Sequence, residues 1–371
     1  MQATWRSGSL HDTALAALLG VHVPIAWQAV APAHAGSAGA LAGTTHVMRF
    51  PLPDLPAAHW LVPSYARVGS TSGYRCSLVA QRADGTPTIA RLASVGACPA
   101  HTGATPGAGI ETPIDAFVTT EALHAPVLLL ECVLPATDDA PDREWFSCSV
   151  RPARLDEATL AHATGHLQGS SAQAAPAYSQ MLLDASLRHR TCSPVCLAMA
   201  SAALGVAAAR DAYVTAVWHS DMHGVWPANI AAAAAAGITG ACELFTRLDD
   251  VVPLLRAGIQ VVVSTRWQPG DLTGSPLPGS GGHLMLLRGV DATHAHVHDP
   301  AAASDAEVPR SYLRNEFCRI WLRERGAAYL LLPPSPTMTR TTPETAAPPA
   351  NERAPDDPAA LAPRAAQRDP A

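Results

Sequence analysis

The sequence predicts an α+β protein in which a β-rich N-terminal unit precedes a unit of mixed helices and strands. Before residue 155, short strand-like runs recur between clusters of Gly, Pro, Ser and Asp. At Cys192, a Ser-Pro pair followed by Ala, Leu and Met marks the start of a helix. Further along, an apolar run from Leu284 to Leu287 and an alternating segment that ends at Asp299 have the pattern of strands.

The length of 371 residues is enough for two domains. In the first unit, spaced runs of this kind are typical of antiparallel strands in a sandwich or jelly roll; they lie at 45–50, 74–81, 125–134 and 145–155. We expect four segments: a β-rich domain (1–155), a linker of small and polar residues (156–177), a second domain (178–333), and a Pro/Ala-rich tail (334–371) expected to be disordered.

Composition excludes several classes of function. Charged residues make up 15% of the chain, the formal net charge is −6, and no basic stripe is visible, so nucleic acid is not an expected partner. No run of about 18 apolar residues occurs, so no membrane span is expected. The apolar N-terminal run is interrupted by His22 and Pro24 and has little basic charge before it, so a cleaved signal peptide is not expected. A cytoplasmic location is slightly favoured, and no oligomeric state is indicated.

Cys192 is the first candidate for a catalytic residue. The start of a helix favours negative charge through the helix dipole and free backbone N–H groups, and so favours the reactive thiolate. The alternative is that Cys192 is a small core residue, because cysteine is among the most buried residue types.

A thiol nucleophile needs a base and a group that orients it. His283 follows three small residues and precedes an apolar run, which places it where a loop enters a buried strand. Asp299 ends the next strand along the chain, and sequential strands are often neighbours, so His283 and Asp299 can meet. Gln180, upstream of Cys192, offers a side-chain N–H for the oxyanion, and the Cys192 backbone N–H offers another. A surface role for Gln180, a structural role for His283 and a simple turn at Asp299 remain alternatives.

Residues from about 178 to 333 resemble the peptidase C39-like family, which is related to the papain-like peptidases that remove double-glycine leaders from bacteriocins. The matching motifs occur in the family's order. They are Tyr178-Ser179-Gln180, CSPVCLAMA from Cys192, VWPANIAAAAAAG from Val225, LDDVVPLLRAGIQVVVS from Leu248, GGHLMLLRGV from Gly281, VHDPAA from Val297 and VPRSYLRNEFCRIWL from Val308.

The resemblance implies a papain-like fold and a cysteine peptidase that acts on a peptide or protein substrate without a cofactor. It implies Cys192 as nucleophile, His283 as base, Asp299 as orienting group and Gln180 as oxyanion donor. Two alternatives remain open: a catalytically silent papain-like domain that binds a partner, and a Cys-His amidase that acts on the cell wall.

Other clusters look like metal or redox sites. His294, His296 and His298 share one strand face, but the outer two lie roughly 13 Å apart at about 3.3 Å per residue, so a solvated face is the preferred interpretation. His219 and His223 have helical spacing, but they lack a Glu base and run into a glycine. A disulfide between Cys192 and Cys196 within one helical turn is geometrically poor. The sequence contains no CxxC pair, so a structural zinc site is not expected.

Overall fold

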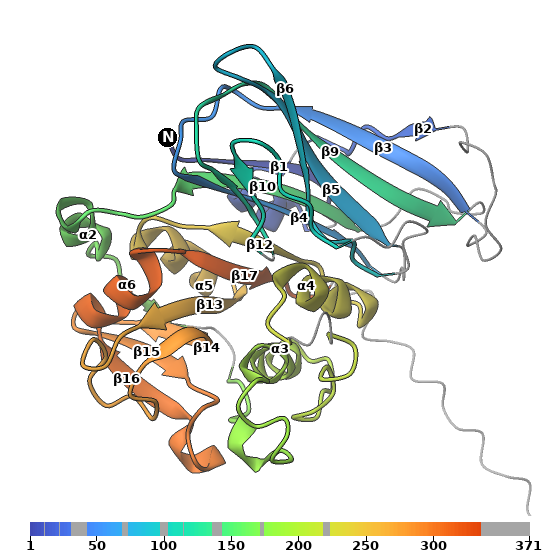
Figure 1. Cartoon of the computed structure of the whole chain (residues 1–371). Helices are drawn as coiled ribbons and strands as arrows, with labels where there is room; N and C mark the ends of the chain where they lie inside the picture. The colour runs from blue at the N-terminus through green and yellow to red at the C-terminus, as the bar shows by residue number, and fades with distance from the viewer. Residues whose placement is uncertain are drawn as a thin grey trace, which may run out of the picture. The chain divides into compact units, whose positions relative to one another are not determined.

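Two five-stranded antiparallel sheets build the N-terminal part of this computed structural model (Figure 1). The structure describes residues 1–10, 12–21, 23–30, 43–68, 73–96, 103–113, 115–135, 143–170, 174–217 and 223–334. In strand order, one sheet contains β1 (Ala3–Ser9), β10 (Glu144–Pro152), β4 (His59–Arg67), β8 (Phe117–Thr119) and β7 (Ile110–Glu111). The other contains β2 (Gln28–Val30), β3 (Gly43–Pro51), β9 (Leu123–Pro135), β5 (Tyr74–Arg82) and β6 (Pro87–Arg91).

The two sheets share one apolar core. Side chains from both sheets, among them Leu61, Leu78, Leu130 and Phe146, are buried in it with exposed fractions of 0%. This arrangement confirms the expected β-rich N-terminal unit. Its strands form where the sequence alternates or runs apolar, and they break at Pro, Gly and Ser-rich segments.

A seven-stranded antiparallel sheet forms the second part. Its order is β12 (Gly240–Leu244), β17 (Ala327–Leu331), β13 (Gln260–Trp267), β14 (Ser280–Val290), β15 (His294–His298) and β16 (Pro309–Leu313), and β11 (Gly169–Ser170) pairs with β14. The last strand in the chain therefore lies between β12 and β13. The mixture of this sheet with helices confirms the α+β class.

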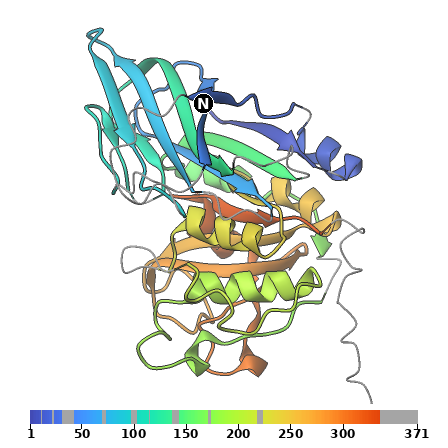
Figure 2. The ribbon, with the colours of Figure 1, turned by 90° about the vertical axis from the view of Figure 1, so that its right-hand side faces the viewer.

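Helices cover both faces of this sheet. Alternate strand residues such as Val262 and Leu286 share a core with α3 (Cys192–Ala203) and α4 (Trp226–Ala235). Their neighbours Val261 and Leu287 face the other core, which contains residues of α1 (Thr13–Leu19), α2 (Glu157–Ala163), α5 (Val252–Arg256) and α6 (Arg314–Leu322). Figure 2 shows α3, in light green, running beside the strands drawn in orange. The period of two therefore divides the sheet residues between two helical layers.

Short 3-10 helices complete the second part at Gln180–Leu182 (η1), Leu248–Val251 (η2) and Asp305–Glu307 (η3). Within the stretch 156–177, α2 and β11 are ordered elements, and residues 171–173 lie outside the described residues. The tail from 335 onward also lies outside them. None of the described helices is long and apolar enough to cross a membrane.

Polar contacts join the β-rich sheet to the edge of the second sheet. Arg6 on β1 donates two hydrogen bonds to the Glu243 carboxylate on β12, at 2.7 and 2.6 Å. The Ser64 hydroxyl on β4 accepts a hydrogen bond from Cys242 N at 2.8 Å. Because Glu243 is completely buried, the bonds from Arg6 satisfy a charge that burial would otherwise destabilise.

Candidate active site

Cys192 is the first residue of α3, where the sequence placed it. The N-cap residue Thr191 makes no side-chain cap, and the backbone N–H of Ser193 contacts the Cys192 thiol. The rest of α3 is almost wholly buried, whereas Cys192 is partly exposed. The helix therefore presents one accessible thiol at its positive end.

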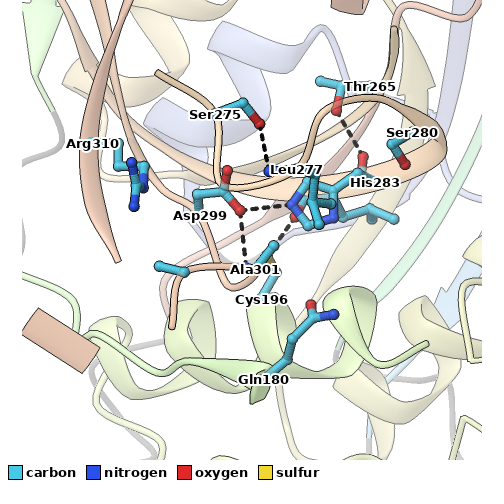
Figure 3. A network of polar contacts seen from close by, with 12 residues as sticks. Gln180, Cys196, Thr265, Ser275, Leu277, Ser280, His283, Asp299, Ala301 and Arg310 are labelled. Atoms are coloured by element: carbon cyan, nitrogen blue, oxygen red, sulfur yellow. Dashed lines mark hydrogen bonds and ion pairs between the residues drawn. The ribbon is translucent and has the colours of Figure 1, made fainter. Parts of the chain in front are cut away.

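His283 and Asp299 lie together, as expected from their place on successive strands. His283 is on β14, and Asp299 directly follows β15, which pairs with β14. The His283 Nε2 and Asp299 Oδ1 atoms are 2.7 Å apart, and both side chains are buried (Figure 3). The strand begins earlier than predicted: β14 starts at Ser280, which pairs with Trp267, so His283 lies inside the strand.

Three groups hold Asp299 as a carboxylate. Besides His283, the Ala301 N–H donates to Oδ1 at 3.0 Å, and the Tyr312 hydroxyl donates to Oδ2 at 2.7 Å. Burial would raise the pKa of Asp299, but the charge of His283 and these hydrogen bonds together keep the pKa below its usual value. Asp299 is therefore an ionised acceptor that fixes one nitrogen of the imidazole.

Cys192 and His283 shift each other's pKa. Burial would raise the pKa of the Cys192 thiol, but the hydrogen bond and charge of His283 outweigh burial and lower it. Burial would lower the pKa of His283, but the Asp299 carboxylate and the contact with Cys192 raise it to about 10. Since Asp299 occupies Nε2, Nδ1 is the nitrogen left for the thiol. The pair therefore favours a thiolate beside an imidazolium.

Gln180 begins η1, a short element anchored by the bond from Gln180 N to Pro300 O at 2.8 Å. Its Nε2 donates to Arg188 O at 2.7 Å, and within the described residues its buried Oε1 has no partner. A side-chain amide has two N–H donors, so Arg188 O leaves one of them for another acceptor. The same bond fixes which side of the amide carries the nitrogen.

Tyr312 is a site residue that the sequence indicated only as part of the family motif. It is buried on β16, and its hydroxyl reaches Asp299. Trp267, which none of the sequence motifs includes, is a second residue of the site, with its ring centroid 5.7 Å from the His283 ring in an edge contact. No local pattern identifies either role, because both depend on how β13 and β16 lie relative to the ends of β14 and β15.

The other clusters that the sequence singled out have separate partners. His296 contacts Asp291 at 2.8 Å, and His298 Nδ1 lies 3.1 Å from Pro176 O. His219 lies outside the described residues. Among the residues that the structure describes, no group of three or more His, Cys, Asp or Glu side chains could hold a metal ion. Cys196 is buried one turn after Cys192, and its thiol donates to Leu284 O at 3.3 Å; the described cysteines are all free.

Comparison with known proteins shows what this region resembles. The family model described as the Peptidase_C39 like family matches residues 172–329. A C39-like peptidase from Bacillus anthracis is similar at 13% identity over 45% of this chain and 98% of that one, with a TM-score of 0.35. A double glycine motif protease from an AMS/PCAT transporter, solved in complex with the leader peptide, is similar at 15% identity over 45% of this chain and 99% of that one, with a TM-score of 0.27. No curated protein matches the chain.

The matched segment contains η1, α3 and the strands β14 and β15, so the family model spans all four residues of the candidate site. The resemblance inferred from the sequence is thereby confirmed: residues 172–329 of this chain match the model of the Peptidase_C39 like family.

Proposed function

We propose that this protein is a cysteine peptidase that hydrolyses peptide bonds, with Cys192 as nucleophile, His283 as base and Asp299 as orienting group. One observation supports this most strongly. A partly exposed thiol at the start of a buried helix is linked through His283 to a buried, ionised Asp299. The match to the model of the Peptidase_C39 like family supports a peptide as the substrate.

The reaction uses side chains and water alone. The Cys192 thiolate attacks the amide carbon, and the imidazolium of His283 protonates the leaving amine as the C–N bond breaks, which leaves a thioester. Water then attacks the thioester while His283 accepts one of its protons, and the C–S bond breaks to restore the thiolate–imidazolium pair. The Cys192 N–H and the second N–H of Gln180 would stabilise the oxyanion in both steps.

Alkylation by iodoacetamide from about pH 5 to about pH 9 tests the thiolate directly. The lowered thiol pKa predicts that Cys192 reacts fastest of the cysteines and still reacts well below the pH at which ordinary thiols ionise. In His283→Ala the thiol loses the hydrogen bond and charge of the imidazole and keeps its burial and two backbone hydrogen bonds, so we expect labelling at pH 6 to slow by about tenfold or more. Peptide mass mapping identifies the labelled cysteine.

If Cys192 reacts no faster than the buried cysteines, or only after unfolding, the nucleophile assignment is wrong. The catalytically silent binding domain would then become the better description. Buried Cys196 is the internal reference, because burial raises the pKa of its thiol well above the usual value.

Tyr312→Phe is expected to lower kcat/KM by roughly tenfold, the usual effect of losing a hydrogen bond to a charged group. The reason is that Asp299 Oδ2 loses its donor, so the pKa of Asp299 rises. Because ionised Asp299 is needed, activity would then be lost at a higher pH as the solution is acidified. The pH dependence of kcat/KM measures this shift of the acid limb.

Tyr213→Phe is the matched control. It also removes a buried tyrosine hydroxyl, which donates to Ser201 in α3 at 2.9 Å, away from Asp299. An equal shift of the acid limb in both variants would show that Tyr312 acts only through stability.

We further propose that residues 178–333 perform the reaction, with 156–177 as the connecting segment and 334–371 as a tail that takes no part in it. Residues 1–155 would be a structural companion. Their hydrogen bonds to β12 support this division, because β12 is the edge strand of the sheet away from β14 and β15.

A further inference from the structure

Arg325 lies at the same end of the sheet as His283. It directly precedes Gly326 and β17, and β17 pairs with β13, whose residue Thr265 is paired with His283. A Cβ atom built on Gly282 would lie 3.6 Å from Arg325 Nη1. Since Gly282 is the residue before His283, the guanidinium of Arg325 lies against the rim of the candidate active site.

Trp226 supports the guanidinium from the helix side. The Arg325 Cζ atom is 5.9 Å from the centre of the Trp226 ring, within the range of a cation–π contact. Trp226 is buried, and its backbone N–H at the start of α4 donates to Asp115 Oδ2 at 3.2 Å. The ring therefore holds the planar head of Arg325 in a fixed place.

Among the described residues, Arg325 has no hydrogen-bond acceptor and no carboxylate within ion-pair distance. Its neighbours on the chain differ, because Glu324 pairs with Arg266 at 3.1 Å and Arg323 pairs with Glu157 at 3.4 Å. Arg325 is partly buried, and burial lowers its pKa. A guanidinium with unused donors in this position favours an anionic ligand.

Asp115, a carboxyl group of the β-rich part, does not fill this role. It approaches Arg325 closely enough for their charges to interact, but it forms no ion pair with it. Its Oδ2 accepts from Trp226 N, its buried Oδ1 has no partner within the described residues, and burial raises its pKa to about 7. Asp115 thus holds the start of α4 and leaves the donors of Arg325 unused.

The start of α3 contacts β17, the strand that follows Arg325. The hydroxyl of Ser193, the residue after Cys192, lies 2.8 Å from the Tyr329 hydroxyl on β17. The residue after Cys192 is therefore joined to β17, the strand that follows Arg325 and Gly326.

We propose that Arg325 is a specificity-determining residue that binds a carboxylate of the peptide substrate at the rim of the Cys192 site, so that acidic peptides are preferred. This inference rests on the proposed cysteine peptidase function. The planar guanidinium can receive a side-chain or C-terminal carboxylate through two parallel N–H donors.

Two alkylating reagents of the same size test the inference without a known substrate. Iodoacetate carries a carboxylate, and iodoacetamide is neutral. In the whole 371-residue chain, we expect Arg325→Gln to lower the ratio of the iodoacetate rate to the iodoacetamide rate at Cys192 by about fivefold to tenfold. Arg266→Gln is the matched control, because it removes an equal charge nearby that Glu324 already neutralises, and its ratio should stay unchanged.

A second variant fills the site instead of removing Arg325. Gly282→Asp places a carboxylate against Arg325 Nη1 and should lower the ratio further than Gly281→Asp, since a Cβ on Gly281 meets nothing within 4 Å. An unchanged ratio in Arg325→Gln, or equal ratios in the two aspartate variants, would overturn the inference and leave the proposed function standing. Slow labelling of Cys192 by both reagents in the wild type would overturn the inference about Arg325 and the proposed cysteine peptidase function together.

Peptide cleavage gives the corresponding result for substrates. A library of proteome-derived peptides, used before and after amidation of its carboxyl groups, should be cleaved about tenfold more slowly once amidated. In Arg325→Gln the two pools should be cleaved equally. Equal cleavage of both pools by the wild type would contradict the preference for acidic peptides while supporting the peptidase.

Discussion

Cys192→Ala is expected to abolish peptide hydrolysis while leaving the fold intact. Without the thiol no thioester forms, and removal of a nucleophile from a catalytic triad lowers kcat on the order of 10⁴ to 10⁶-fold. The side chain is partly exposed at the first position of α3, where alanine is a good helix former, so cooperative unfolding should persist. Cleavage of a peptide library by mass spectrometry and the thermal unfolding curve measure the two effects.

Cys196→Ser is the control for a general need for thiols. Cys196 is buried one helical turn later, and a serine hydroxyl can replace its donation to Leu284 O. This variant should remain active, with Cys192 still labelled by iodoacetamide. Activity of Cys192→Ala equal to that of the wild type would rule out Cys192 as nucleophile.

The parts of the site that could be predicted from the sequence depend on local order along the chain. Cys192 could be placed because helix-start signals are local, and His283 and Asp299 could be placed together because β14 and β15 are sequential strands. The strands of the N-terminal unit follow from their alternating and apolar runs for the same reason.

The parts that could not be predicted depend on pairings between distant segments. Arg325 reaches the rim of the site because β17, the last strand, lies between β12 and β13, an order that no periodicity reveals. Tyr312 approaches Asp299 only once β16 has folded back along β15. The bond from Gln180 to Arg188 O likewise follows from the path of the loop before α3 rather than from either residue type.

Arg151→Met is expected to destabilise the protein by about 3 to 5 kcal/mol. Arg151 on β10 has an exposed fraction of 0%, and it donates to Phe245 O at 2.8 Å and to Leu322 O at 2.6 Å, which joins the β-rich part to the ends of β12 and α6. Burial lowers its pKa to about 10, so the buried charge itself has a free-energy cost. Methionine removes that cost but leaves two carbonyls without their donors, at about 1–3 kcal/mol each, together with an imperfectly filled space.

The midpoint of urea unfolding measures this change in the free energy of unfolding, and Arg154→Met is the control. Arg154 is exposed on the same segment, so its loss should change stability by less than about 0.5 kcal/mol. Equal midpoints for the two variants would mean that the carbonyls of Phe245 and Leu322 find water in place of the guanidinium. A fall confined to Arg151→Met, with a single cooperative transition in both variants, would show that the β-rich part and the seven-stranded sheet unfold as one unit, because the lost bonds connect the two.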